Sequence, residues 1–176
     1  MGIIRRYKSQ MHGNYWRAVL RYGFYSGLIL SFVVLVRYWL IYPLSQPLTY
    51  VENIALILLM FIFLWRYRLR LTDKLISFKE GYIVCFGLGV VASVIYGIFI
   101  YVYAWKIDSG MQQRCYDVQR VLENNVNLTD EQVRFMTTPS SIAFSAIILS
   151  VVVSIIMAMV VALLLRTEKS EVIKKK

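Results

Sequence analysis

The sequence is poor in the residues from which most catalytic and metal sites are built. It contains one histidine, His12, two cysteines and ten acidic residues among 176. With a single histidine, no Cys–His zinc set, His-Glu-x-x-His helix or serine triad can be assembled. A glycine-rich phosphate loop of the P-loop type is also missing. We therefore predict that the chain is not an enzyme and has no catalytic residue, no metal and no cofactor.

Charged residues are also scarce, at 17% of the chain, whereas 59% is hydrophobic and the mean hydropathy is +0.58. A soluble domain of this length cannot bury so much apolar surface, which indicates a membrane protein. The same composition argues against a disordered chain and against a disulfide-stapled secreted fold. The net charge of +10 would suggest nucleic acid in a soluble protein. Here we interpret it as charge beside a bilayer and predict no nucleic-acid partner.

Four windows are long and apolar enough to cross ~30 Å of hydrocarbon, which takes about 20 residues. They cover residues 22–42, 49–65, 82–105 and 141–165. We predict an all-α integral membrane protein, a four-transmembrane-helix bundle that forms a single membrane domain over residues 1–176. A short amphipathic helical segment is expected between the third and fourth spans.

Lysine and arginine cluster in three of the segments outside these windows: residues 1–21, 66–81 and 166–176. The turn 43–47 is uncharged, and residues 106–140 carry basic and acidic side chains in balance. Because basic residues near span ends stay in the cytoplasm, both termini, 1–21 and 166–176, are predicted to be cytoplasmic. Residues 106–140 are then expected on the outer side.

Small residues recur at every fourth position in three windows, which places each set on one helical face. The sets are Gly23, Gly27 and Ser31, then Gly89, Ser93 and Gly97, then Ala146, Ser150, Ser154, Ala158 and Ala162. We predict that these faces pack against one another within the chain, with homodimerisation as the alternative. The second window lacks such a face, which suits a lipid-facing helix at the edge of the bundle.

Aromatic residues gather at the window ends, as in the interfacial belts of membrane proteins. The set comprises Tyr15, Trp16, Tyr22, Tyr25, Tyr38, Trp39, Tyr42, Trp65, Tyr67, Tyr82, Tyr101, Tyr103 and Trp105. We interpret it as a belt rather than as a stacking surface for a cofactor.

Two charged residues, Arg37 and Glu52, fall within the first two windows on either side of a short turn. Ionisable residues inside a membrane are candidates for function by default. Since both lie at a similar depth, we predict an intramembrane ion pair that closes a helical hairpin. A site for an external anion is the alternative.

Residues 106–140 resemble two short amphipathic helices. Met111, Cys115, Val118 and Leu122 recur at helical spacing. Thr129 and Gln132 form a capping box that predicts the start of the second helix. A cap on the membrane surface and a partner-docking surface both fit this pattern. Asn127 also begins a glycosylation sequon, a pattern that is common by chance.

Arginines flank the predicted cytoplasmic ends of the first two spans. Arg17, Arg21, Arg66 and Arg70 are candidate contacts for a lipid or polyprenyl phosphate, since each charge near an anionic surface contributes about 1 kcal/mol. Topology alone also explains basic residues at these positions.

Several of these features together resemble a known family. They are Tyr22-Gly23 with Gly27, a basic loop that runs into Ile76-Ser77-Phe78-Lys79-Glu80-Gly81, a glycine-rich third span, and an outer segment before a small-residue fourth span. Over roughly residues 15–166 the chain resembles a Bacteroidota inner-membrane family known as domain of unknown function 4199. The resemblance implies four spans in a bacterial inner membrane, no assigned activity, and genes near membrane glycosyltransferases. The layout is also similar to GtrA-like proteins, which serve polyprenyl-linked glycosyl transfer. Neither resemblance supplies a catalytic residue.

Two functions follow as hypotheses. The first is a non-catalytic inner-membrane accessory or scaffold subunit whose partners are the lipid bilayer and another membrane protein, with a glycosyltransferase or a second copy of the chain as candidates. The second is a lipid-handling, polyprenyl-phosphate-binding protein that assists a membrane glycosyltransferase.

Overall fold

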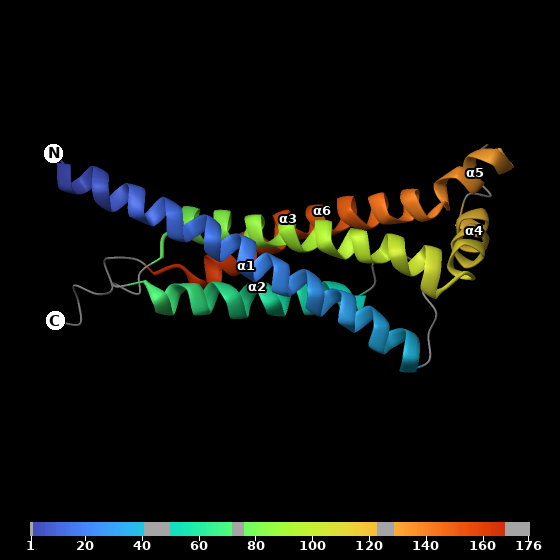
Figure 1. The fold of residues 1–176 in the computed structure, drawn as a ribbon, viewed down its shortest axis with the longest axis horizontal. Helices are drawn as coiled ribbons and strands as arrows, with labels where there is room; N and C mark the ends of the chain where they lie inside the picture. Colours follow the sequence, from blue (N-terminus) through green and yellow to red (C-terminus); the bar gives the residue numbers. More distant parts are fainter. Residues whose placement is uncertain (1, 41–49, 72–75, 123–128, 168–176) are drawn as a thin grey trace.

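A computed structural model of the chain describes residues 2–40, 50–71, 76–122 and 129–167 (Figure 1). It contains α1 (Gly2–Leu40), α2 (Tyr50–Arg70), α3 (Phe78–Val102), the π-helical turn η1 (Tyr103–Ile107), α4 (Met111–Leu122), α5 (Asp130–Met136) and α6 (Pro139–Leu165). The described part of the chain has no strand, so the predicted all-α fold class is confirmed.

Four helical stretches are long and apolar enough to cross a membrane: Tyr15–Leu40, Tyr50–Arg70, Phe78–Ile107 and Pro139–Leu165. The third comprises α3 and η1. The chain is therefore a multi-pass membrane protein with four candidate spans. Helices α1 and α2 extend beyond the predicted windows 22–42 and 49–65, to Gly2 and to Arg70 respectively.

Helix α1 begins and α6 ends at the same end of the bundle, and α4 and α5 lie at the opposite end (Figure 1). We call the first the basic end, after Arg17, Arg21, Arg66, Arg68 and Arg70, and the second the cap end. The part of α1 before the spans projects beyond the other helices at the basic end (Figure 1).

Helix α3 is the centre of the bundle and packs along both α1 and α6. On the α1 side, a Cβ added to Gly27 would lie 2.7 Å from Ile95 Cβ and 3.1 Å from the carbonyl oxygen of Ala92. A Cβ on Gly23 would lie 2.6 Å from Val91 Cβ. The two helices therefore approach closely only because α1 presents glycine at these positions.

The same close approach occurs between α3 and α6. Added Cβ atoms on Gly89 and Gly97 would collide with Ser154 and Ile147 of α6. The five small residues of α6 that recur at every fourth position are all buried: Ala146, Ser150, Ser154, Ala158 and Ala162. The prediction that the small-residue faces pack within the chain is confirmed.

Three of the serines in these interfaces bond their hydroxyls within their own helix, whereas the buried Ser150 hydroxyl has no hydrogen-bond partner among the described residues. Ser31, Ser93 and Ser154 each donate to the carbonyl oxygen four residues earlier, at 2.8, 2.7 and 2.7 Å. The small side chain thus permits close packing without leaving these hydroxyls unsatisfied.

Helix α2 lies against the outside of the other three spans and exposes Ile54, Leu58, Ile62, Trp65 and Leu69. Its opposite face buries Leu56, Met60 and Leu64. This arrangement fits a helix at the edge of the bundle that faces lipid.

The cap begins where α3 changes to the π-helical turn η1. Helix α4 follows and buries Met111 and Cys115 against the core. Helix α5 starts at the predicted capping box: Thr129 N donates to Gln132 Oε1 at 2.9 Å, and Gln132 N donates to Thr129 Oγ1 at 3.4 Å. This prediction is confirmed. The sequon at Asn127 lies outside the described residues.

The belt of aromatic residues needs a correction at two positions. Most of its described members are exposed, including all four tryptophans, but Tyr22 is 4% exposed and Tyr103 is fully buried. Tyr42 lies outside the described residues. These two rings face neighbouring helices rather than the surface. The belt prediction was wrong for them because residue type and position along a span do not reveal which face of a helix a ring occupies.

Candidate functional site

Arg37 of α1 and Glu52 of α2 meet near the cap end. Arg37 Nη1 donates to Glu52 Oε1 at 3.0 Å and to Oε2 at 3.4 Å. The Glu52 side chain is fully buried, whereas Arg37 is 21% exposed. The structure thus brings the two predicted partners together, with the carboxylate inside and the guanidinium reaching outward.

A third helix contributes to this cluster through Tyr96 of α3. Tyr96 is fully buried and lies close enough to Glu52 and Arg37 to interact with both charges. A buried carboxylate is strongly unfavourable unless it is paired and hydrogen-bonded. The cluster therefore neutralises Glu52 and joins α1, α2 and α3, which is the geometry of a structural pair.

A second polar cluster, not anticipated from the sequence, centres on Asp108 at the start of the cap. Tyr103 Oη donates to Asp108 Oδ2 at 3.0 Å, and Arg114 forms an ion pair with the same oxygen. The ring of Tyr38 packs edge-on against Tyr103, with centroids 5.7 Å apart. Helix α1 is thereby linked to α4 through η1.

The π-helical turn explains why sequence reasoning missed this cluster. The Asp108 N–H donates to the Tyr103 carbonyl oxygen at 2.9 Å, a spacing of five residues. In a regular α-helix, residues four apart share a face. Tyr103 and Asp108 are five apart, so helical periodicity did not predict that they meet. The available signal was an acidic residue directly after an apolar span, with an arginine six residues later.

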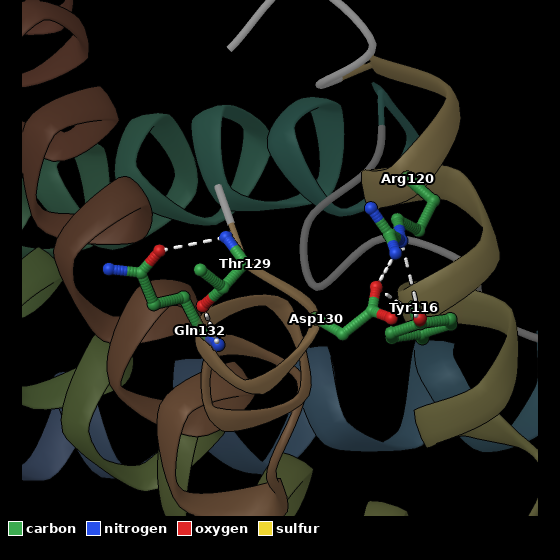
Figure 2. Close-up of polar contacts among 5 residues, drawn as sticks. All are labelled: Tyr116, Arg120, Thr129, Asp130 and Gln132. Atoms are coloured by element: carbon green, nitrogen blue, oxygen red, sulfur yellow. Dashed lines mark hydrogen bonds and ion pairs between the residues drawn. The ribbon is translucent and has the colours of Figure 1, made fainter. Parts of the chain in front are cut away.

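A third cluster fastens α4 to α5 within the cap (Figure 2). Arg120 forms an ion pair with Asp130, and its Nε donates to Tyr116 Oη at 3.2 Å. Tyr116 Oη donates to Asp130 Oδ1 at 3.4 Å, and the Arg134 guanidinium lies 5.7 Å from the Tyr116 ring centre. These side chains are largely at the surface, so each contact alone adds little, about 0–1 kcal/mol. Together they define how the two short helices meet.

The cysteine of the cap is a poor nucleophile. Cys115 is 8% exposed. Burial raises the pKa of its thiol to about 11, while Arg114 lowers and Asp108 raises the pKa by smaller amounts. Cys115 therefore belongs to the core rather than to a reactive site.

Apolar side chains remain exposed on the cap. Val121 and Phe135 are each 73% exposed, and Met136 is 46% exposed. In a span such exposure is explained by lipid, but these residues lie in α4 and α5, outside the candidate spans.

The four arginines proposed as lipid contacts all lie at the basic end and are exposed: Arg17, Arg21, Arg66 and Arg70. They differ in their surroundings. The Arg70 guanidinium lies 5.6 Å from the ring centre of the buried Tyr22, and that of Arg21 lies 6.0 Å from the ring centre of the exposed Tyr25. Among the described residues none of the four forms an ion pair.

A neighbouring arginine has a structural role instead. Arg68 Nη1 donates to the carbonyl oxygen of Leu165 at 3.4 Å. This carbonyl is at the C-terminus of α6, where the helix leaves acceptors without intrahelical donors. Arg68 therefore caps α6 and was not among the predicted lipid contacts.

No group of three or more histidine, cysteine, aspartate or glutamate side chains that could hold a metal ion occurs in the part of the chain that the structure describes.

Comparison with known proteins places the chain in a family. The family model described as Protein of unknown function (DUF4199) matches residues 21–167, most of the chain, so the protein belongs to this family. No curated protein and no solved structure matches the chain significantly.

Proposed function

We propose that this member of the DUF4199 family is a non-catalytic accessory or scaffold subunit of a bacterial inner membrane, with its basic end in the cytoplasm. Its partner is another membrane protein, and a glycosyltransferase is the class that the family resemblance implies. In this proposal the four spans anchor the protein and the cap is the surface that the partner contacts.

The observation that carries the proposal is the cap. Two side-chain clusters position it: Asp108 with Arg114, and Arg120 with Asp130. It nevertheless leaves Val121 and Phe135 largely exposed beyond the spans. An exposed apolar surface beyond the spans supports an interaction site.

Photo-crosslinking tests the proposal directly. A photoreactive phenylalanine analogue placed at Phe135 or Val121 should yield an adduct with the same second membrane protein in cells. Phe144 of α6 is the matched control, because it is 64% exposed but lies in a span and should crosslink to lipid. Purification of the protein alone in mild detergent, with no protein adduct from either cap position, would overturn the proposal.

Lipid handling is a second candidate function, and one observation favours it. Exposed arginines of α1 and α2 converge at the basic end, where Tyr22 is buried and its hydroxyl has no hydrogen-bond partner among the described residues. In this role the protein would hold a lipid phosphate, such as that of a polyprenyl carrier, for a membrane glycosyltransferase.

A further inference from the structure

We propose that Arg70 and Tyr22 form a binding site for one phosphate group at the basic end of the bundle, and that the ligand is the phosphate headgroup of a membrane lipid. This inference rests on the second candidate function and assigns it a site. The shared chemistry is a phosphate mono- or diester oxygen held by a guanidinium and a phenolic hydroxyl.

The two residues are brought together by the packing of α1 on α2. The Tyr22 ring stacks on Phe63 of α2, with centroids 4.8 Å apart and an interplanar angle of 16°. The Arg70 guanidinium carbon lies 5.6 Å from the centre of the same ring. Phe63 and Arg70 are seven residues apart, so one face of α2 holds the ring and supplies the charge.

The Tyr22 hydroxyl is a buried donor without an acceptor among the described residues. Tyr22 is 4% exposed, and its Oη has no hydrogen-bond partner in the described structure. Native proteins rarely leave a buried hydroxyl unsatisfied. The Arg70 guanidinium lies over the ring that carries this hydroxyl, so the unsatisfied donor and the positive charge are on adjacent side chains.

Two other charged groups near this end already have partners. Arg68 caps α6 through the Leu165 carbonyl oxygen, and Glu80 accepts hydrogen bonds from Ser77 N and Oγ at 3.2 and 3.0 Å. Arg70 has no carboxylate partner among the described residues. Its planar fork of donors suits a phosphate, and such charge-assisted bonds are among the strongest hydrogen bonds.

The surroundings favour a lipid over a soluble anion. Arg66 lies one turn before Arg70 on the same helix and is exposed, which adds positive charge beside the site. Trp65 and Leu69 are each 52% exposed on α2, so an acyl chain has apolar surface to follow toward the bundle centre. Arg70 is itself exposed, and its flexible side chain can leave the Tyr22 ring to engage a phosphate at small cost.

The chain contains a matched control for the experiment. Arg21 lies over Tyr25 as Arg70 lies over Tyr22, with 6.0 Å against 5.6 Å. Both pairs are near the basic end, and both lose one charge and one hydroxyl when replaced. Tyr25, however, is 45% exposed and faces outward.

The measurement is native mass spectrometry of the full chain, purified in mild detergent with phosphatidylglycerol or phosphatidylcholine added. We expect wild type to retain phosphatidylglycerol selectively. Tyr22→Phe and Arg70→Gln should each reduce retention about tenfold, the loss of one charge-assisted hydrogen bond. Tyr25→Phe and Arg21→Gln should remain within about twofold of wild type. Tyr22→Phe removes only an unsatisfied hydroxyl, so its thermal stability should be unchanged, which separates lost binding from lost folding.

The alternative outcomes are distinguishable. If wild type retains no anionic lipid, the lipid-handling function fails together with the site. If wild type retains lipid but the two pairs of variants lose it equally, lipid handling stands and the assigned site is wrong. If inorganic phosphate alone stabilises wild type but not Tyr22→Phe, and no lipid is retained, the residues are right and the lipid ligand is overturned.

Discussion

Replacement of Arg37 by alanine is the sharpest test of the architecture at the cap end. The change leaves the fully buried Glu52 carboxylate without the guanidinium that donates to both of its oxygens at 3.0 and 3.4 Å. Because Glu52 is fully buried, its charge then lacks its ionic partner inside the bundle, which lowers the stability of the folded state.

The size of the stability loss depends on how exposed Arg37 and Glu52 are. Removing one member of a fully buried pair costs about 3–5 kcal/mol, whereas exposed pairs contribute about 0–1 kcal/mol. Here Glu52 is fully buried and Arg37 is 21% exposed. Tyr96 also remains beside the carboxylate. We therefore expect Arg37→Ala to lower the free energy of unfolding by about 1–3 kcal/mol.

The opposite replacement should be milder. Glu52→Gln leaves an arginine whose head already reaches the surface and can extend further toward the headgroups. We expect a cost below about 1 kcal/mol, and the double variant should recover much of the loss seen in Arg37→Ala. We therefore expect the two single replacements to differ: losing Arg37 should lower the free energy of unfolding more than losing Glu52 does.

The assay is reversible unfolding of the detergent-solubilised protein, followed by circular dichroism, for wild type, both single variants and the double variant. Arg21→Ala is the control, since Arg21 is exposed and forms no ion pair among the described residues. It should change stability by less than about 0.5 kcal/mol. A coupling energy between positions 37 and 52 below about 0.5 kcal/mol would refute the reasoning.

The same variants separate a structural pair from an external anion site. For an anion site, Glu52→Gln should tighten anion binding because it removes a competing charge, and Arg37→Ala should affect binding more than unfolding. The burial of Glu52 favours the structural pattern.

Three further predictions concern other parts of the molecule. In thermal unfolding, Gly27→Leu should lower stability by about 1–3 kcal/mol because the new side chain meets the backbone of α3. Gly81→Ala should be neutral or slightly stabilising, since its methyl group would lie 3.4 Å from its nearest neighbour. Equal effects of the two replacements would contradict the packing. Burial raises the pKa of Cys115 to about 11, against 9.0 for an unperturbed thiol. Iodoacetamide should therefore alkylate Cys115 about 100-fold more slowly than a peptide cysteine at pH 8, and the alkylation rate should rise about tenfold per pH unit toward pH 11. An ordinary rate at pH 8 would show an accessible thiolate. In a cysteine-free background, Val121→Cys should react with an impermeant maleimide in intact cells and Arg66→Cys only after permeabilisation; the reverse pattern would overturn the proposed orientation.

Much of the fold follows from local sequence. The four spans are apolar stretches long enough to cross a bilayer, and a bilayer leaves a single-span segment no alternative to the helix. The capping box of Thr129 and Gln132 is equally local, because both hydrogen bonds lie within four residues. The faces made of small residues were also evident, since spacing by four defines a helical face.

The candidate sites were less predictable. Arg37 and Glu52 were identified because charge inside an apolar window is conspicuous, and a short turn places them at equal depth. The cluster of Tyr103, Asp108 and Arg114 was missed, because a π-helical turn changes which residues align and no local pattern announced that turn.

Sequence alone thus determined that the chain is helical, that it has four spans and that its basic and balanced segments lie at opposite ends, since hydropathy and charge act on each segment independently of its neighbours. It did not distinguish Tyr22 from Tyr25, two tyrosines less than a turn apart that occupy the same kind of position in one span. Only the tertiary structure buries the first between α1 and α2 and leaves the second exposed. The physical reason is that the exposure of a side chain depends on which helix packs against its face, and that packing is decided by residues distant in the chain.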